Sequence, residues 1–173
     1  SGNLILSDEN TKLENEINEY LGTKFCLTLN SGTDALMIAL WALGIKKGDE
    51  VITSAVSFIA TAAAIAHVGA KPIFVDVDIK TLQIDANLIE KKINSKTKAI
   101  MIPNLIGNIP NWKRIKKIAT KHNLKIIEDS ADTLGAKIDK KDQLVTWWNC
   151  WVRADKGIFP INFDAFMKTW KRS

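Results

Sequence analysis

The chain has few of the residues that build metal sites and disulfide frameworks. Its 173 residues include two cysteines and two histidines. Cys26 and Cys150 lie far apart, in no spacing typical of zinc ligands or of a small disulfide scaffold, and neither His67 nor His122 belongs to a ligand motif. The sequence therefore predicts no metal site and argues against a fold held together by disulfides.

A long apolar run and a basic-then-apolar leader at the start are also absent. Membrane-spanning helices need about 20 apolar residues, and secretory signals begin with positive charge followed by an apolar stretch. We therefore expect a cytoplasmic protein with no membrane partner. The net charge of +5 comes from lysines dispersed over predicted helical faces, without an arginine-rich block. This pattern indicates that the lysines lie on a solvated surface and that the protein has no nucleic-acid partner. Nucleic-acid binding is the alternative interpretation of the positive charge.

What the chain does contain is an alternation of short apolar runs with amphipathic helical patterns. A hydrophobic fraction of 46% at this length suffices for one globular core. Strands are expected at residues 25–29, 50–53, 72–75, 99–102 and 124–128, and helices at 34–43, 58–68, 86–93 and 112–122, after a first helix that ends at Gly22. This order predicts an α/β fold, three-layered around a mostly parallel, doubly wound sheet. In such sheets ligands gather at the carboxyl ends of the strands.

A turn of small residues follows the first predicted strand and opens a helix. It reads Asn-Ser-Gly-Thr-Asp-Ala-Leu at residues 30–36. The first N–H groups of a helix have no intrahelical acceptor and lie at the positive end of its dipole, so this turn suits a phosphate. Its spacing matches neither a dinucleotide fingerprint nor a P-loop, which argues against NAD and ATP. The alternative is an ordinary capped turn in which Ser31 or Thr33 satisfies its own helix.

Two more candidates lie at predicted strand ends. Asp129 follows the run at 124–128, and a carboxylate there can keep a heteroaromatic nitrogen protonated, as pyridoxal 5'-phosphate (PLP) requires. Capping of the next turn is the alternative for Asp129. Phe58 is interpreted either as a ring that stacks on a flat ligand or as part of the core. Asp76 and Asp78 are interpreted as turn residues.

Five motifs occur in a specific order along residues 1–140. They are the turn at 30–36, Gly-Asp-Glu-Val-Ile-Thr at 48–53, Phe-Val-Asp-Val-Asp at 74–78, Thr-Lys-Ala-Ile at 97–100, and Ile-Glu-Asp-Ser-Ala-Asp-Thr-Leu-Gly-Ala at 127–136. In these motifs the chain resembles the DegT/DnrJ/EryC1/StrS family of PLP-dependent enzymes. The resemblance implies a large domain of the aspartate aminotransferase fold (fold type I) and activity on nucleotide-linked keto sugars.

The resemblance also implies a cofactor, partners and site residues. PLP would be the cofactor, a nucleotide sugar the substrate, and a homodimer with shared active sites the assembly. Gly32, Thr33 and the Asp34 backbone would hold the cofactor phosphate, Phe58 would cover one ring face, and Asp129 would pair with the pyridine nitrogen.

Asp132 is the remaining residue that the resemblance places at the cofactor. It stands where the family's aminotransferases usually carry Gln or His. With Ile-Pro-Asn-Leu-Ile-Gly-Asn at residues 102–108, it is more similar to the branch related to the sugar 3-dehydrases. In that branch a histidine replaces the Schiff-base lysine, and water is eliminated from C3 of the sugar.

The resemblance ends near residue 140. The family's Ser-Phe-x-x-x-Lys (or His) motif is not found here, because Lys168 follows Phe163 without the preceding serine or a glycine turn. The catalytic residue is therefore unknown. Residues 1–140 are interpreted as a partial, truncated PLP-binding large domain, and residues 141–173 as a tail without family resemblance. The tail holds four tryptophans in no regular period, at Trp147, Trp148, Trp151 and Trp170.

The expected function is that of a fragment of a sugar aminotransferase acting on a nucleotide-linked 4-keto-6-deoxy sugar, catalytically incomplete as it stands. One alternative is a PLP-dependent sugar 3-dehydrase. The other is a non-catalytic phosphate-ligand or protein-binding α/β module, with the tail as an interaction surface. Family members have two further strands between the first and fifth strands predicted here. We expect residues 144–152 to pair with the sheet edge at that gap, because an open edge accepts many backbone partners.

Overall fold

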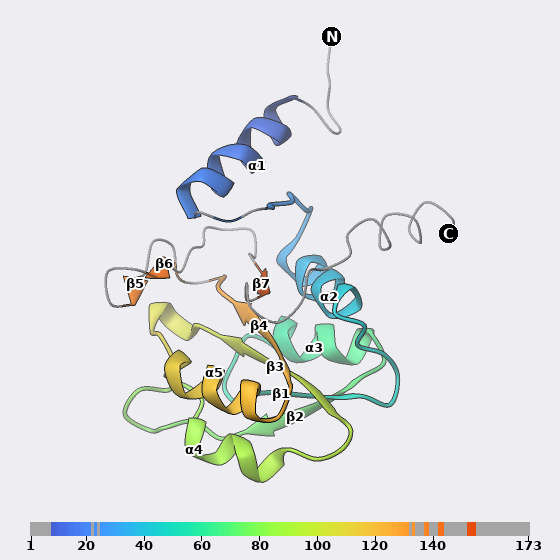
Figure 1. Cartoon of the computed structure of the whole chain (residues 1–173), viewed down its shortest axis with the longest axis vertical. Coiled ribbons are helices and arrows are strands. Elements are labelled where there is room, and N and C mark those ends of the chain that lie inside the picture. Colours follow the sequence, from blue (N-terminus) through green and yellow to red (C-terminus); the bar gives the residue numbers. More distant parts are fainter. Residues whose placement is uncertain are drawn as a thin grey trace.

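A parallel sheet with helices on both faces forms the centre of the molecule, and helix α1 (Asp8–Leu21) stands apart from these layers (Figure 1). The computed structural model describes residues 8–21, 23, 25–131 and 133, and the short strands at 137–138, 142–143 and 152–154. None of the described helices is long and apolar enough to cross a membrane.

The sheet has the strand order β2-β1-β3-β4-β7. Its first four strands are parallel, and the fifth joins β4 in antiparallel orientation. Their bounds are β1 (Glu50–Ser54), β2 (Lys71–Val75), β3 (Thr97–Pro103), β4 (Lys125–Asp129) and β7 (Val152–Ala154). β5 (Lys137–Ile138) and β6 (Asp142–Gln143) form a separate antiparallel pair.

The register aligns isoleucines across the four parallel strands. Ile52 of β1 lies between Ile73 of β2 and Ile100 of β3, and Ile100 lies beside Ile126 of β4. β-Branched side chains pack well on a pleated surface, so this row supports the sheet. Because successive strand residues point to opposite faces, their neighbours, such as Val51, enter the core on the other face.

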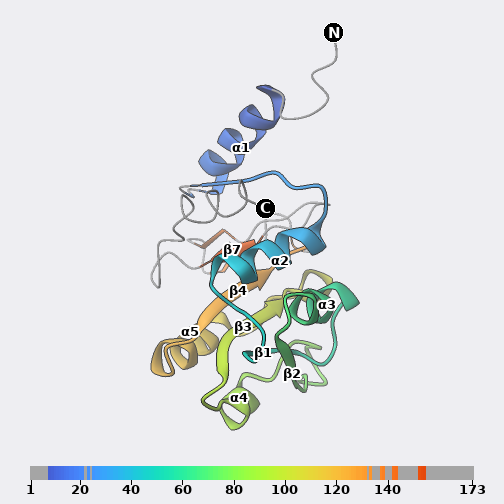
Figure 2. The same ribbon diagram turned by 90° about the vertical axis from the view of Figure 1, so that its right-hand side faces the viewer.

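Each face of the sheet is covered by its own helices, which makes three layers (Figures 1 and 2). α2 (Gly32–Ala42) and α3 (Ile59–His67) cover one face. α4 (Ala86–Ile89), the 3-10 turn η1 (Glu90–Lys92) and α5 (Trp112–Lys121) cover the other. A second 3-10 turn, η2 (Leu105–Gly107), follows β3. The predicted three-layer, mostly parallel α/β fold is confirmed.

A surface ion cluster joins η1 to the end of α5. Glu90 Oε1 accepts hydrogen bonds from Lys121 Nζ at 2.8 Å and from His122 Nε2 at 2.9 Å. The pKa of Glu90 is lowered from 4.5 to about 2, mainly by the hydrogen bond from Lys121 and next by the hydrogen bond from His122. The predicted helix at 86–93 is thus present as a short α-helix and a 3-10 turn, held to α5 by side chains.

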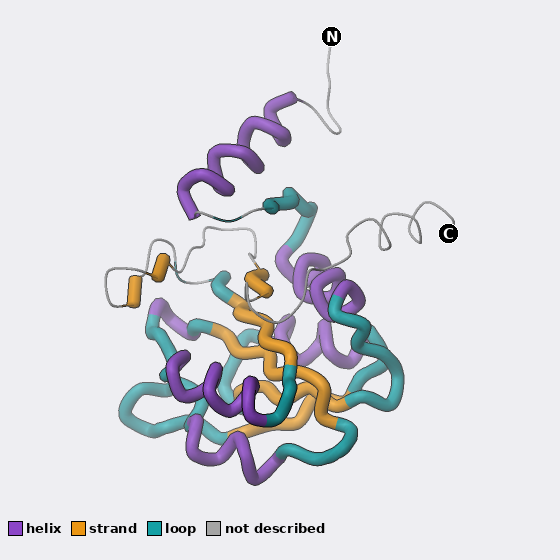
Figure 3. The backbone as a smooth tube through the Cα atoms, in the orientation of Figure 1, coloured by secondary structure: helices purple, strands orange, loops and turns teal. Residues whose placement is uncertain are grey.

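Figure 3 colours the helices, strands and loops of the structure, which can be compared with the predicted elements. The strands predicted at 50–53, 72–75, 99–102 and 124–128 are confirmed to within two residues at each end. The strand predicted at 25–29 is wrong. That segment is loop, with Phe25 76% exposed and Leu27 44% exposed.

Residues 25–29 do not form a strand because a strand needs a neighbouring strand edge with which to exchange backbone hydrogen bonds. The segment leads into α2, which contacts β4 and β7. The outer edge of β4 is already paired with β7, with Asp129 opposite Val152 and Ile127 opposite Ala154. An apolar run without a free edge beside it has no ladder of backbone hydrogen bonds to join.

The predicted pairing of residues 144–152 with the sheet edge can be compared with the structure only at residue 152, the last residue of that segment. A strand on the edge of β4 does form, but at Val152–Ala154, and it shares only Val152 with the predicted segment 144–152. Trp147, Trp148, Trp151 and Trp170 lie outside the described residues, as does Gly22 at the predicted end of the first helix.

Candidate functional site

A cleft of about 390 Å³ opens at the carboxyl ends of β1, β3 and β4. Its walls come from the first turn of α2, the β1–α3 connection with the start of α3, and the residues that end β3 and β4. The lining residues are Gly32, Thr33, Leu36, Ser57, Phe58, Ala60, Thr61, Pro103, Asn104, Leu105, Asp129 and Ala131. The cleft therefore lies where a doubly wound sheet is expected to bind its ligand.

Four of the six residues predicted for the site meet in this cleft. Gly32, Thr33, Phe58 and Asp129 all line it, although they come from three separate parts of the sequence. Asp34 lies in the first turn of α2 but not on the cleft wall. Asp132 lies outside the described residues.

The start of α2 is a capped turn that still directs two residues of its first turn toward the cleft. Ser31 is the N-cap, and its Oγ accepts a hydrogen bond from Asp34 N at 3.1 Å and donates one to Asp34 Oδ2 at 2.7 Å. The cap therefore already uses the N–H of Asp34. The N–H groups of Gly32 and Thr33 precede it in the first turn, where no intrahelical acceptor exists, and both residues face the cleft. An anion in the cleft would meet these two groups and the positive end of the helix dipole.

Asp129 places a buried carboxylate on the part of the cleft wall formed by the end of β4. The residue is 6% exposed, and its Oδ2 accepts a hydrogen bond from Thr61 Oγ1 at 2.8 Å. Its backbone carbonyl accepts a hydrogen bond from Asn104 N at 2.8 Å, which continues the pairing of β3 with β4. The second carboxylate oxygen, Oδ1, accepts a longer hydrogen bond from Ala131 N at 3.4 Å. A buried carboxylate of this kind would bind a cationic nitrogen strongly.

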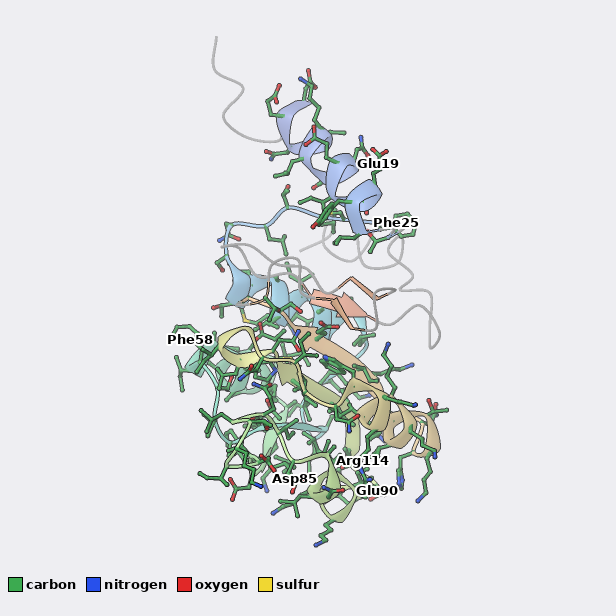
Figure 4. All side chains as sticks on the ribbon, turned by 90° about the vertical axis from the view of Figure 1, so that its left-hand side faces the viewer. Glu19, Phe25, Phe58, Asp85, Glu90 and Arg114 are labelled. Atoms are coloured by element: carbon green, nitrogen blue, oxygen red, sulfur yellow. The ribbon has the colours of Figure 1, made fainter. Side chains whose placement is uncertain are left out.

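Phe58 stands at the rim of the cleft. It is the N-cap residue of α3 and is 72% exposed, and its side chain projects from the surface in Figure 4. The interpretation of Phe58 as a core residue is therefore wrong. An exposed ring beside a polar cleft is available to stack on a planar ligand.

A buried polar network lies behind the cleft wall. Asn104 Nδ2 donates hydrogen bonds to Glu128 Oε1 at 2.8 Å and to Ser130 Oγ at 2.9 Å. Asn104 Oδ1 accepts a hydrogen bond from Trp112 Nε1 at 3.0 Å, and Ser130 Oγ donates one to Glu128 Oε1 at 2.9 Å. These bonds tie the ends of β3 and β4 to α5 directly behind the part of the wall that carries Asp129.

Sequence reasoning missed Thr61 and the network role of Asn104. The available signal for Thr61 was a hydroxyl residue three positions after Phe58, in the first turn of an otherwise apolar helix. Such a residue shares a helix face with position 58. Nothing in the sequence indicated its partner.

Asp76 and Asp78 serve turns, as predicted. Asp76 Oδ1 accepts a hydrogen bond from Val77 N at 2.8 Å, and Asp78 Oδ1 accepts bonds from Lys80 N at 2.9 Å and Thr81 N at 3.0 Å. Asp78 also lines a second cleft, of about 360 Å³, which shares no lining residue with the first. Within the part of the chain that the structure describes, no group of acidic, histidine and cysteine side chains is placed to hold a metal ion.

Comparison with known proteins identifies the sequence pattern. Residues 1–143 match the DegT/DnrJ/EryC1/StrS aminotransferase family. UDP-2-acetamido-2-deoxy-3-oxo-D-glucuronate aminotransferase from Pseudomonas aeruginosa is 41% identical over 140 residues, covering 81% of this chain and 39% of that protein.

Solved structures agree with the sequence comparison. The aminotransferase from Psychrobacter cryohalolentis is 38% identical and superposes with a TM-score of 0.74, over 76% of this chain and 33% of its own. GDP-4-keto-6-deoxymannose-3-dehydratase, solved with a trapped PLP-glutamate geminal diamine, is 32% identical with a TM-score of 0.73, over 78% of this chain and 36% of its own. The chain thus spans less than half the length of each of these proteins.

Proposed function

Because the chain belongs to the DegT/DnrJ/EryC1/StrS aminotransferase family, we propose that residues 1–140 are part of the large domain of a PLP-dependent enzyme that acts on a nucleotide-linked keto sugar. The observation that carries this proposal is the meeting of Gly32, Thr33, Phe58 and Asp129 in one cleft. We propose that residues 141–173 are a separate tail that does not contribute to this cleft.

The three kinds of group in the cleft suit the three parts of PLP. The first-turn N–H groups of Gly32 and Thr33 would bind the phosphate, with the Asp34 N–H contributing if it shares its bond to Ser31. The Asp129 carboxylate would pair with the protonated ring nitrogen, and the Phe58 ring would cover one ring face. Asp132 would add a further contact. When bound, PLP supplies an electron sink for bonds that break at the substrate carbon.

The proposed reaction is amino transfer to a nucleotide-linked 4-keto-6-deoxy sugar. Amino transfer to a nucleotide-linked keto sugar is supported by the Pseudomonas aeruginosa relative, whose name describes an aminotransferase acting on a UDP-linked 3-oxo sugar. The 4-keto-6-deoxy form is supported by the neighbour named GDP-4-keto-6-deoxymannose-3-dehydratase. No residue of this chain is assigned as the nucleophile toward the cofactor aldehyde, so we propose that these 173 residues bind PLP reversibly and do not turn over substrate. The complete enzyme would act as a homodimer.

Sugar 3-dehydration is the second candidate. It is favoured by Ile-Pro-Asn-Leu-Ile-Gly-Asn at 102–108, by Asp132, and by the structural similarity to GDP-4-keto-6-deoxymannose-3-dehydratase. Reading the coding DNA beyond codon 140 in all three frames separates the two candidates. A Ser-Phe-x-x-x-Lys motif would favour amino transfer, and the histidine variant would favour dehydration.

PLP binding by the 173-residue chain tests the cofactor proposal. PLP would be titrated into the wild type and into Asp129→Ala, and the dissociation constant would be measured from tryptophan fluorescence. We expect saturable binding with an absorption spectrum close to that of free PLP, competition by inorganic phosphate, and loss of binding in Asp129→Ala. Absence of binding to the folded wild type, or equal binding by both proteins, would contradict the proposal.

A further inference from the structure

A chain of hydroxyl groups connects the Asp129 carboxylate to the outer wall of the cleft. Thr61 Oγ1 lies 2.8 Å from Asp129 Oδ2, and Ser57 Oγ lies 2.7 Å from Thr61 Oγ1. Thr61 is 1% exposed, whereas Ser57 is half-buried. The Thr61 hydroxyl is therefore shielded from water, and water does not compete with it for the Asp129 carboxylate.

The direction of these hydrogen bonds follows from the number of protons. A carboxylate accepts, so the single hydroxyl proton of Thr61 is donated to Asp129. Thr61 then has only lone pairs to offer Ser57, so the proton in the 2.7 Å contact comes from Ser57. Ser57 has one hydroxyl proton and shares it between Thr61 Oγ1 and the Phe58 carbonyl, which accepts at 3.1 Å. Because Thr61 accepts from Ser57 while it donates to Asp129, the bond from Ser57 polarises the Thr61 hydroxyl toward the carboxylate.

The same turn also holds Phe58. Thr61 N donates a hydrogen bond to the Phe58 carbonyl at 3.2 Å, and Ser57 Oγ lies 3.1 Å from that carbonyl. The first turn of α3 is thus bonded both to the residue at the cleft rim and to the carboxylate on the cleft wall.

We propose that Thr61 is a positioning residue, whose hydroxyl orients the Asp129 carboxylate toward the ring nitrogen of the bound cofactor, with Ser57 holding Thr61 in the required rotamer. This inference rests on the proposed function. If the inference holds, the Thr61 hydroxyl raises the affinity only for ligands that carry a basic ring nitrogen. The reason is that it acts through Asp129 and not through the contacts with the phosphate or the ring face.

The test uses the full chain, two ligands and matched variants. The ligands are PLP and an analogue of PLP in which a C–H group replaces the ring nitrogen. Thr61→Val removes the hydroxyl at nearly constant shape, and Thr61→Ser keeps it. Thr53→Val is the control, because Thr53 is a buried threonine of the adjoining strand whose hydroxyl has no hydrogen-bond partner among the described residues.

We expect Thr61→Val to weaken PLP binding by about tenfold, the effect of one hydrogen bond to a charged group. Thr61→Ser should restore PLP binding to within about threefold of the wild type, and Thr53→Val should leave it unchanged. The analogue should bind the wild type and Thr61→Val equally. If Thr61→Val weakened both ligands to the same extent, the hydroxyl would serve only the fold and the proposal would be overturned.

Asp129→Asn separates failure of this inference from failure of the proposed function. If Asp129→Asn weakens PLP binding while Thr61→Val does not, the cofactor proposal stands and the role of Thr61 is refuted. If the wild type and Asp129→Asn bind PLP equally, both proposals fail. Circular dichroism checks the folding of each variant. If Thr61→Val does not fold, Ser57→Ala replaces it, with an expected weakening of about threefold for PLP alone. An unchanged affinity in Ser57→Ala would overturn the inference.

Discussion

Replacing Asn104 with alanine should destabilise the fold more than any other single truncation of a polar side chain near the cleft. Asn104 is 1% exposed and joins the ends of two strands to α5. Its side chain donates to Glu128 and Ser130 and accepts from the indole N–H of Trp112. Asn104→Ala removes these three hydrogen bonds and leaves the backbone bond from Asn104 N to Asp129 O in place.

The expected loss in the free energy of unfolding follows from the buried polar groups that lose a hydrogen-bond partner in Asn104→Ala. The indole N–H of Trp112, a residue that is 4% exposed, loses its acceptor, and the Glu128 carboxylate loses one donor but keeps the Ser130 hydroxyl at 2.9 Å. A buried polar group without its partner costs about 1–3 kcal/mol, so we expect a loss of about 3 kcal/mol in the free energy of unfolding. Because small domains are stable by about 5–15 kcal/mol, the variant should fold but unfold at much lower urea concentration.

Urea denaturation followed by circular dichroism measures this loss without depending on tryptophan fluorescence. Trp112→Phe supplies the matched control, since it removes the indole N–H, keeps a ring in the core, and should cost about 1 kcal/mol. In the double variant no indole N–H is left without an acceptor, so its cost should be about 1 kcal/mol less than the sum of the two single costs. A loss below about 1 kcal/mol for Asn104→Ala, or strict additivity in the cycle, would refute the reasoning.

Five other variants have expected outcomes that can be measured directly. Asp129→Ala should abolish PLP binding. Thr33→Ala keeps the backbone N–H but removes the Thr33 hydroxyl as a further donor to the phosphate, so it should weaken binding by about 1 kcal/mol. Unchanged titrations for both variants would show that the cleft does not hold the cofactor. The pKa of Glu90 is lowered from 4.5 to about 2 in the folded chain, so its contribution to stability is present above pH 4.5 and is lost as the pH falls toward 2. Glu90→Gln should therefore reduce the fall in thermal stability over that pH interval, and an identical fall would contradict the assignment. Thr53→Val should raise the free energy of unfolding by about 1 kcal/mol, because the buried hydroxyl of Thr53 has no partner among the described residues, and a loss in urea denaturation would show a hidden partner. Ile106 has a φ of 55°, which β-branched residues adopt at a cost of about 1–3 kcal/mol, so Ile106→Asn should stabilise the chain, and a lower midpoint of unfolding would contradict this strain.

The elements whose signals are local were predictable from the sequence. Strands β1 to β4 show as short runs rich in β-branched residues, and α5 shows as an apolar stripe at helical spacing, because the period of a strand or a helix is expressed within its own residues. The positions of Gly32 and Thr33 at a helix start and of Asp129 at a strand end follow from those elements. Parallel strands then bring the candidate residues to one edge, so the cleft was foreseeable in outline.

Pairing and long-range hydrogen bonds were decided only by the tertiary structure. Residues 25–29 have the composition of a strand, but a strand forms only beside a free edge, and β7 occupies the edge of β4. Thr61 looks like any small residue of a helix until the fold brings its hydroxyl to Asp129, 68 positions away. Periodicity specifies which face of an element is apolar, whereas the partner of a polar group depends on the register and packing of the whole sheet. The sequence by itself therefore determined the layers and the edge of the sheet where the candidate cleft lies, and the tertiary structure decided which side chains contact one another at that edge.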